Sequence, residues 1–340
     1  MSRVVLVTGV SRDLGARFAR ALAASGDREV IGLDATAPTH ELGRARYVRA
    51  DLRSPVLARV VLDRQVDTVV HLGLADSARS RAAAKEANVI GTMQLLAGCQ
   101  KAPSFKKFVL LSSGGVYGAG PIDPARFTEE MAGRHPARSG LPRDALEVES
   151  YLGGLGVRRP DVVRTVLRPA ALMGGGVRTQ LTNWLSLPVV PRPLGYDARL
   201  QFLHPADAVA ALEAVTLHDV PGTYNVAAPD VLTLSQILGI LGRPGIGVPV
   251  EASELVSGLG RRTRLVSFSS ADVRTLTWGR ALDTTAFVEA TGVRPHYTSR
   301  RAVEEFAALA TPGALAEGPV DRVLDIAAGL LTRGRIGGAG

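Results

Sequence analysis

The chain has 340 residues, 46% of them hydrophobic, and its 40 Lys and Arg against 32 Asp and Glu give a formal net charge of +8. This size and hydrophobicity exclude an intrinsically disordered chain and allow a large buried core. The apolar runs are shorter than the ~18 residues of a membrane helix, so we expect no membrane span. The first strand is predicted from about residue 3, which leaves no space for a secretory signal. A single cysteine, Cys99, cannot form an internal disulfide, and we therefore expect a cytoplasmic protein.

The positive charge does not by itself indicate a nucleic-acid partner. The basic residues are scattered, without a run of about five or six, and nearly all of them are arginines. Proteins that bind nucleic acid gather such charge on one face or in one segment. We therefore disfavour nucleic acid as a partner, and we expect no metal site.

Short apolar strands alternate with helical patterns through the first half of the chain, which predicts a parallel sheet built from βαβ units. The predicted strands cover residues 3–8, 29–34, 46–49, 68–71, 107–111 and 162–167. The predicted helices cover residues 14–24, 55–64, 82–100 and 144–156. Glycine and proline mark the loops 114–124, 174–176 and 188–193.

After Pro169 the alternation becomes irregular, as expected where a smaller lobe is inserted, and a late strand over 223–227 returns to the main sheet. We assign residues 1–170 and about 202–229 to a dinucleotide-binding domain. Residues 171–201 and 230–312 are assigned to a substrate lobe, and 313–340 to a C-terminal amphipathic helix and tail. The helix is indicated by apolar residues at helical spacing within 319–331.

The beginning of the chain has the pattern of a buried strand, a tight glycine turn and a helix, which seats a dinucleotide pyrophosphate. Gly9 permits the turn that brings backbone N–H groups to the phosphates, and Gly15 lets the helix pack close to the strand. Asp34 follows about 20 residues later, a spacing that suits a carboxylate accepting from the adenosine 2′-OH. It would repel a 2′-phosphate, which favours NAD over NADP. The alternative for Asp34 is a residue that only begins a turn.

Further motifs follow in order along the chain. They are Thr8-Gly9 with Gly15, Asp51-Leu52, His71-Leu72-Gly73, Asn88-Val89 with Gly91-Thr92, Ser112-Ser113 with Val116-Tyr117-Gly118, Leu167-Arg168-Pro169, Leu203 to Val209, Thr223 to Val226, and Leu282-Asp283-Thr284. In this order and spacing the chain resembles the extended short-chain dehydrogenases of the nucleotide-sugar epimerase/dehydratase type over roughly residues 3–300.

The resemblance implies an α/β fold with a doubly wound parallel sheet of the Rossmann type and a smaller substrate-binding lobe. It implies NAD as the cofactor, a nucleotide sugar or a similar small molecule as the substrate, and a homodimer. It also implies which residues contact the cofactor: Gly9, Ser11, Arg12, Asp13, Leu14, Gly15, Asp34, Asp51, Leu52, Leu72, Gly73, Asn88, Ser112, Arg168 and Pro169. Ser113 matches the active-site serine of the family.

The expected dimer contact uses the helices 82–100 and 144–156, which have apolar faces of Val89, Met93 and Leu96 and of Leu146, Tyr151 and Leu155. The alternative is that these faces only cover the sheet. Arg12 stands where the family has the middle glycine of the turn. Its guanidinium could clamp the phosphates, crowd them, or point to solvent.

A larger departure concerns the Tyr-x-x-x-Lys pair that does the acid–base work in the family. An alignment on 146–149 puts Leu141 at the tyrosine position and Ala145 at the lysine position, and no lysine follows Lys107. Tyr151 lies ten residues beyond Leu141, roughly 15 Å along a helix, and cannot substitute. His135, Arg143 and Asp144 are the remaining acid–base candidates, although each is expected to be a solvated surface residue.

Two functions therefore stay open. The first is an NAD-dependent sugar-nucleotide epimerase or dehydratase of the UDP-glucose 4-epimerase type, with atypical acid–base residues. If the chain is such an enzyme, we expect a polar cleft near Ser113 and the loop after Gly174. The second is a non-catalytic NAD(H)-binding sensor or scaffold, which predicts a cleft closed by apolar side chains such as Leu141.

Overall fold

A computed structural model describes residues 3–74, 80–133, 140–250 and 270–309. Its centre is a seven-stranded sheet in the order β11-β6-β5-β4-β1-β2-β3, and every neighbouring pair is parallel. The strands are β1 (Arg3–Thr8), β2 (Arg28–Asp34), β3 (Arg46–Arg49), β4 (Thr68–His71), β5 (Lys107–Leu111), β6 (Val163–Pro169) and β11 (Gly222–Val226). The predicted strands of the first half and the late returning strand are confirmed to within one or two residues.

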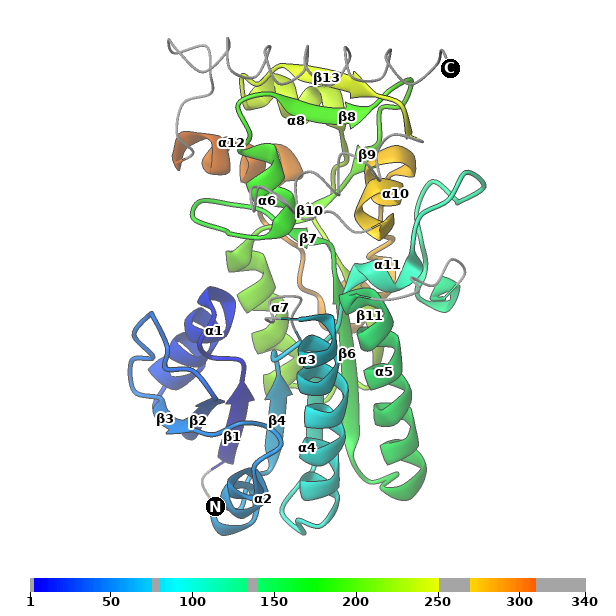
Figure 1. Cartoon of the computed structure of the whole chain (residues 1–340). Coiled ribbons are helices and arrows are strands. Elements are labelled where there is room, and N and C mark those ends of the chain that lie inside the picture. Colours follow the sequence, from blue (N-terminus) through cyan, green and yellow to red (C-terminus); the bar gives the residue numbers. More distant parts are fainter. Residues whose placement is uncertain (1–2, 75–79, 134–139, 251–269, 310–340) are drawn as a thin grey trace, which may run out of the picture.

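Helices cover both faces of this sheet (Figure 1). On one face α1 (Asp13–Ala24) packs against α7 (Pro205–Leu217). On the other face α4 (Gly91–Gln100) packs between α2 (Pro55–Asp63) and α5 (Leu141–Arg158). The strand order and the two helical layers are those of the doubly wound Rossmann fold, so the fold class predicted from the sequence is confirmed.

Two predicted helices differ from the structure. The helix predicted over 82–100 consists of α3 (Arg81–Lys85), a π-turn (Glu86–Ile90) and α4. Such π-turns are short insertions that often occur at functional sites. The helix predicted from 144 begins at Leu141, with Pro142 in its first turn. Proline is accepted there because the first helical N–H groups have no partner within the helix.

Part of the apolar faces predicted for dimerisation is buried, and the dimer contact itself stays a prediction. Val89, Leu96 and Leu155 are buried within the subunit, and Leu96 and Leu155 belong to the cluster around the sheet. Ile90, Met93, Tyr151 and Val157 are the exposed large apolar residues of the π-turn, α4 and α5.

A smaller lobe lies beyond the carboxyl ends of the parallel strands (Figure 1). Its described residues form three two-stranded sheets, which pair β7 (Ala171–Leu172) with β10 (Phe202–Leu203), β9 (Arg199–Leu200) with β12 (Leu232–Thr233), and β8 (Val190–Pro193) with β13 (Gly245–Val248). The helices among them are α6 (Gln180–Leu185), α8 (Leu234–Ile240), α10 (Ser270–Trp278) and α12 (Ser299–Leu309). Between α10 and α12 in the chain, α11 (Thr285–Thr291) packs against β11 of the main sheet.

The loop predicted over 188–193 is wrong from Val190 onward, because Val190–Pro193 form β8. The prolines at 191 and 193 are tolerated because β8 belongs to a two-stranded sheet with free edges.

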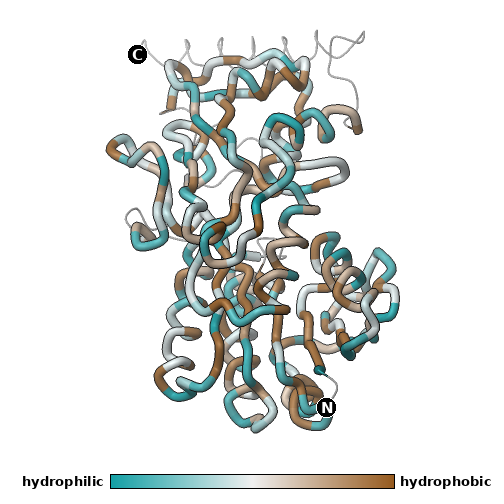
Figure 2. The backbone as a smooth tube through the Cα atoms, turned by 180° about the vertical axis from the view of Figure 1, so that it is seen from behind, coloured by the Kyte–Doolittle hydropathy of each residue, from teal (hydrophilic) through white to brown (hydrophobic). Residues whose placement is uncertain are grey.

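The buried apolar residues form two clusters, and Figure 2 shows hydrophobic segments running through both lobes. The larger cluster surrounds the parallel sheet and includes Phe18, Phe108 and Leu212. The smaller one includes Trp184, Phe202 and Phe306. The domain boundaries given above remain a proposal, and the amphipathic helix expected within 319–331 lies outside the described residues. Within the described part of the chain, no helix is long and apolar enough to cross a bilayer.

Candidate functional site

The glycine turn between β1 and α1 leaves no space for side chains. Gly9 has φ +83°, and a Cβ there would lie 2.6 Å from the carbonyl oxygen of Leu72. A Cβ on Gly15 would lie 2.2 Å from the carbonyl oxygen of Gly9. The backbones of the strands, the turn and the helix are therefore in direct contact, and the N-terminus of α1 lies beside the ends of β1 and β4. This cradle fits a pyrophosphate, because the first N–H groups of a helix favour an anion.

Ser11 and Asp34 meet at the end of β2. One carboxylate oxygen of Asp34, Oδ2, accepts from the Ser11 backbone N at 3.1 Å and from its hydroxyl at 2.7 Å. The other, Oδ1, accepts from the Thr36 backbone N at 3.1 Å, which is the turn contact of the alternative interpretation. A carboxylate has about four acceptor positions, so Asp34 can fill the turn role and still accept from a ribose.

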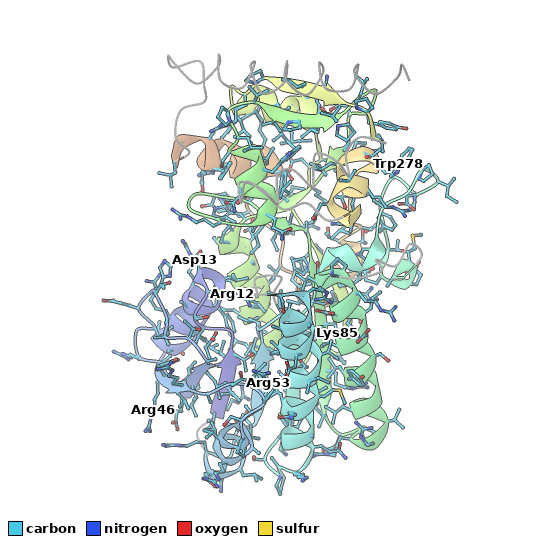
Figure 3. All side chains as sticks on the ribbon, in the orientation of Figure 1. Arg12, Asp13, Arg46, Arg53, Lys85 and Trp278 are labelled. Carbon is cyan, nitrogen blue, oxygen red and sulfur yellow. The ribbon has the colours of Figure 1, made fainter. Side chains whose placement is uncertain are left out.

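Arg12 crosses from the glycine turn to the loop after β4. Its guanidinium donates to the carbonyl oxygen of Leu74 at 2.7 Å and to that of Gly73 at 3.3 Å. Figure 3 shows Arg12 and Asp13 at the end of the main domain that faces the smaller lobe. Arg12 is exposed, but its guanidinium is held by these two backbone carbonyls beside the cradle.

The other predicted cofactor residues of this region are Asp13, Leu14, Asp51, Leu52 and Leu72. Asp13 and Leu14 form the first turn of α1, and the Asp13 carboxylate pairs with Arg17 at 2.8 Å. Asp51 pairs with Arg53 at 2.7 Å, and the hydrogen bonds from Arg53 lower the pKa of Asp51. Leu52 lies against Gly73 and Gly91, and Leu72 is buried.

A buried polar chain joins the ends of β1 and β4 to the π-turn. The Thr92 hydroxyl donates to the carbonyl oxygen of Asn88, so it accepts from His71 Nε2 at 2.8 Å. His71 Nδ1 then accepts from the Thr8 hydroxyl at 2.6 Å. Burial lowers the pKa of His71 to about 3, and the ring is neutral. The chain fixes Asn88, a predicted cofactor residue, relative to the glycine turn.

Ser113 follows the end of β5, as the family pattern implies, and the short turn after it (Gly114–Tyr117) contacts α5. Its Oγ accepts from the Gly115 backbone N at 3.0 Å, and Gly115 lies directly against Pro142. Leu141 packs on the main core and Ala145 is completely buried. Neither side chain can donate or accept a proton.

Ser112 and Arg168 belong to an internal network centred on Glu149. The Ser112 hydroxyl donates to Glu149, and Arg168 donates to both of its oxygens, at 3.1 and 2.6 Å. Arg168 also donates to the Tyr117 hydroxyl at 3.0 Å. Pro169 ends β6 beside this network. These groups hold α5 to β5 and β6, and their contact with the cofactor stays a prediction.

Tyr117 and Tyr151 are the two tyrosines closest in sequence to Leu141, and neither takes its place. The Tyr117 hydroxyl donates to Asn225 Oδ1 at 2.6 Å, and burial raises the pKa of Tyr117. Its ring stacks on Phe127, with a centroid distance of 5.2 Å. Tyr151 is exposed on α5.

The expectation that Asp144 is a solvated surface residue is wrong. Its side chain is 0% exposed and pairs with Arg81, because α3 and the π-turn cover the first turn of α5. Arg143 is exposed, as predicted, and pairs with Glu147 at 3.2 Å. His135 lies outside the described residues.

Sequence reasoning missed Arg81 altogether. The pair joins residues 63 positions apart, and no periodic pattern relates them. The sequence offered one signal for the pair: Asp144 is an acidic residue directly before Ala145, which the alignment places at the family's lysine position.

A cavity of about 140 Å³ lies beyond the end of β6. It is lined by Ala170, Ala171, Leu181, Leu200, Gln201, Phe202, Asp272, Thr275, Leu276, Arg280 and Leu282. Leu282 also lies against Gly114, so the cavity adjoins the loop that contains Ser113. Burial lowers the pKa of Arg280 to about 10, which leaves it charged at neutral pH.

Comparisons with solved structures agree with the fold. MoeE5 in complex with UDP-glucuronic acid and NAD aligns with a TM-score of 0.72 and 20% identity, over 90% of this chain and 98% of that one. UDP-glucose 4-epimerase from Thermotoga maritima with UDP-glucose gives 0.70 and 21%, over 90% and 98%. dTDP-glucose 4,6-dehydratase from Bacillus anthracis in complex with NAD gives 0.68 and 19%, over 90% and 96%.

Sequence comparisons identify relatives and the family. An uncharacterized protein of Mycobacterium tuberculosis is 41% identical over 312 residues, which are 89% of this chain and 83% of that protein. Residues 5–227 match the model of the NAD dependent epimerase/dehydratase family. The resemblance and the cofactor of the family, NAD, are those predicted from the sequence. The chain belongs to the NAD-dependent epimerase/dehydratase family.

Proposed function

We propose that the chain is an NAD-binding member of this family that takes a nucleotide sugar or a similar small molecule and has altered acid–base chemistry. The first turn of α5 supports this, because Leu141 and Ala145 occupy the positions of the tyrosine and the lysine. Losing a general acid–base group typically costs ~10²–10⁴-fold in rate. We therefore expect bound NAD with weak or absent turnover of UDP-hexoses.

The residues at the glycine turn fit the cofactor. Gly9, Gly15 and the N-terminus of α1 would hold the pyrophosphate, and Asp34 would accept from the adenosine ribose. Arg12 would add a charge-assisted contact to the phosphates once it leaves the carbonyls of Gly73 and Leu74. When bound, NAD supplies the hydride acceptor of the family chemistry. Because the Asp34 carboxylate repels a 2′-phosphate, NAD should bind more tightly than NADP.

The cavity beyond β6 is our candidate for part of the substrate site. Its walls are mainly apolar, and Arg280 and Asp272 add one charge of each sign. A guanidinium matches phosphate or carboxylate through two parallel N–H groups, and a carboxylate accepts from hydroxyl groups. This combination supports a small polar substrate beside the loop of Ser113.

The alternative is a non-catalytic sensor or scaffold that binds NAD(H). The burial of Ala145 and the packing of Leu141 on the core favour it, because apolar side chains close the site where relatives carry the acid–base pair.

The double variant Leu141→Tyr with Ala145→Lys separates the two functions. We would measure epimerisation of UDP-hexoses and reduction of bound NAD, with Leu141→Phe and Ala145→Met as the control of similar size. A rise in turnover in the double variant alone supports the enzyme. No change despite bound NAD supports the sensor. Turnover by the unaltered protein at the rate of its relatives would refute the proposal.

We further propose a cytoplasmic homodimer. Ile90, Met93, Tyr151 and Val157 are exposed on the π-turn, α4 and α5, and α4 and α5 lie side by side. Exposed apolar residues grouped on adjacent helices are typical of a protein contact. Self-association would remove them from water.

A further inference from the structure

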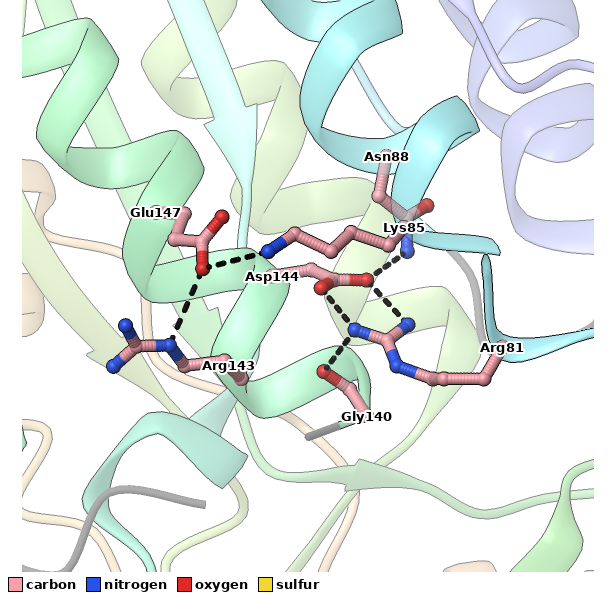
Figure 4. A network of polar contacts seen from close by, with 7 residues as sticks. All are labelled: Arg81, Lys85, Asn88, Gly140, Arg143, Asp144 and Glu147. Atoms are coloured by element: carbon pink, nitrogen blue, oxygen red, sulfur yellow. Dashed lines mark hydrogen bonds and ion pairs between the residues drawn. The ribbon is translucent and has the colours of Figure 1, made fainter. Parts of the chain in front are cut away.

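The first turn of α5 holds a carboxylate that is entirely surrounded by protein. Asp144 is 0% exposed. It accepts from both terminal nitrogens of Arg81, with 2.7 Å between Nη1 and Oδ2, and from Asn88 Nδ2 at 2.9 Å. Figure 4 shows how α3 and the π-turn bring these donors to the start of α5. A buried carboxylate needs this compensation, because an unpaired one would be strongly destabilising.

The guanidinium lies against the two altered positions. Arg81 Nη2 also donates to the carbonyl oxygen of Gly140 at 3.3 Å. Gly140 directly precedes Leu141, and Asp144 directly precedes Ala145. The Arg81 side chain is 36% exposed, whereas Asp144 is not exposed at all. The Arg81 guanidinium is therefore the accessible member of the pair. It lies beside the first turn of α5, next to Ala145, the position aligned with the family's lysine.

Hydrogen bonds connect the pair to the edge of the sheet where we expect the cofactor. Asp34, at the end of β2, marks the adenosine half. The other half of a dinucleotide extends across the crevice toward β4 and β5. The chain from Thr8 through His71 and Thr92 ends at Asn88, and the Asn88 amide donates to Asp144. Thr8 and His71 are the last residues of β1 and β4, so hydrogen bonds connect the pair to this edge of the sheet.

We propose that Arg81, beside the position of the missing lysine, is a cofactor-binding residue. Its guanidinium donates to the hydroxyl oxygens of the nicotinamide ribose, and Asp144 orients it. This inference rests on the proposed binding of NAD. Arginine remains protonated at any physiological pH, so it holds the ribose but moves no proton.

The test uses three ligands that differ at the proposed contact. NAD and ADP-ribose contain the second ribose, and ADP lacks it. We expect Arg81→Gln to weaken NAD and ADP-ribose about 10-fold, as for loss of a hydrogen bond to a charged group, and to leave ADP unchanged within about twofold. Arg81→Lys should weaken the same two ligands less. Arg143→Gln, which removes an exposed ion pair on the same helix turn, is the matched control and should change none of them.

A second variant keeps the test valid if Arg81→Gln does not fold. The pair Arg81→Gln with Asp144→Asn removes both charges and serves in the same titrations. Equal weakening of all three ligands, or of none, would overturn the proposal. If ADP and NAD both fail to bind the unaltered protein, the proposed function itself is wrong.

Discussion

The close approach of α1 to the glycine turn predicts a large effect of one methyl group at Gly15. A Cβ there would lie 2.2 Å from the carbonyl oxygen of Gly9, whereas ordinary contact begins at 3.4 Å. The helix and the turn must therefore separate by about 1 Å. Overpacking of this kind costs up to ~3 kcal/mol, and the helix preference of alanine over glycine offsets ~1 kcal/mol. We expect Gly15→Ala to lower the free energy of unfolding by about 2 kcal/mol.

The same displacement moves the N–H groups of α1 away from the pyrophosphate. Loss of one hydrogen bond to a charged group corresponds to a decrease in NAD affinity of about 10-fold or more. Urea unfolding and calorimetric titration with NAD measure the two effects. Gly153→Ala in α5 is the matched control, because nothing lies within 4 Å of its added Cβ; it should stabilise by ~0.5–1 kcal/mol and leave NAD binding unchanged. A Gly15→Ala protein with unaltered stability and affinity would refute the reasoning.

Three further predictions follow. Asp34→Ala should weaken NAD and narrow the gap between NAD and NADP in calorimetry, whereas equal affinities in the unaltered protein would contradict the role of Asp34. The folded state protonates His71 only at about pH 3, but the unfolded state does so near pH 6.5. Stability from this group is therefore present above about pH 6.5 and lost as the pH falls toward 3, by at most ~1.4 kcal/mol per pH unit. His71→Gln should flatten this slope in urea unfolding, and an unchanged slope would count against the neutral buried ring. Ile90→Arg should convert a dimer into a monomer by light scattering, whereas Ile122→Arg, at a residue 84% exposed outside α4 and α5, should not; a monomeric unaltered protein would argue against the dimer.

Local patterns predicted the parallel sheet well, because most of its strands are short apolar runs between glycine, proline or polar residues. The runs at residues 3–8 and 107–111 coincide with β1 and β5. The glycine turn was predictable for a similar reason, since Gly9 and Gly15 meet a steric demand that only glycine satisfies.

Contacts between distant segments were not predictable from spacing. The burial of Asp144 depends on Arg81 and Asn88, and nothing in the residues around Asp144 encodes a partner 63 positions away. β8 was missed because its prolines are typical of loops, and only its pairing with β13 makes it a strand. The burial of Val89, Leu96 and Leu155 within the subunit was not predictable either, because helical periodicity identifies an apolar face but not the element that covers it.

The most direct test of the account combines binding and chemistry in the unaltered protein. NAD is titrated into the protein by calorimetry, and UDP-glucose is then added while the absorbance of NADH is followed. We predict saturable NAD binding, tighter than that of NADP, with little or no NADH formed, because Leu141 and Ala145 cannot take up the proton that accompanies hydride transfer. Rapid and stoichiometric reduction of the bound NAD, or a failure to bind NAD, would contradict the account.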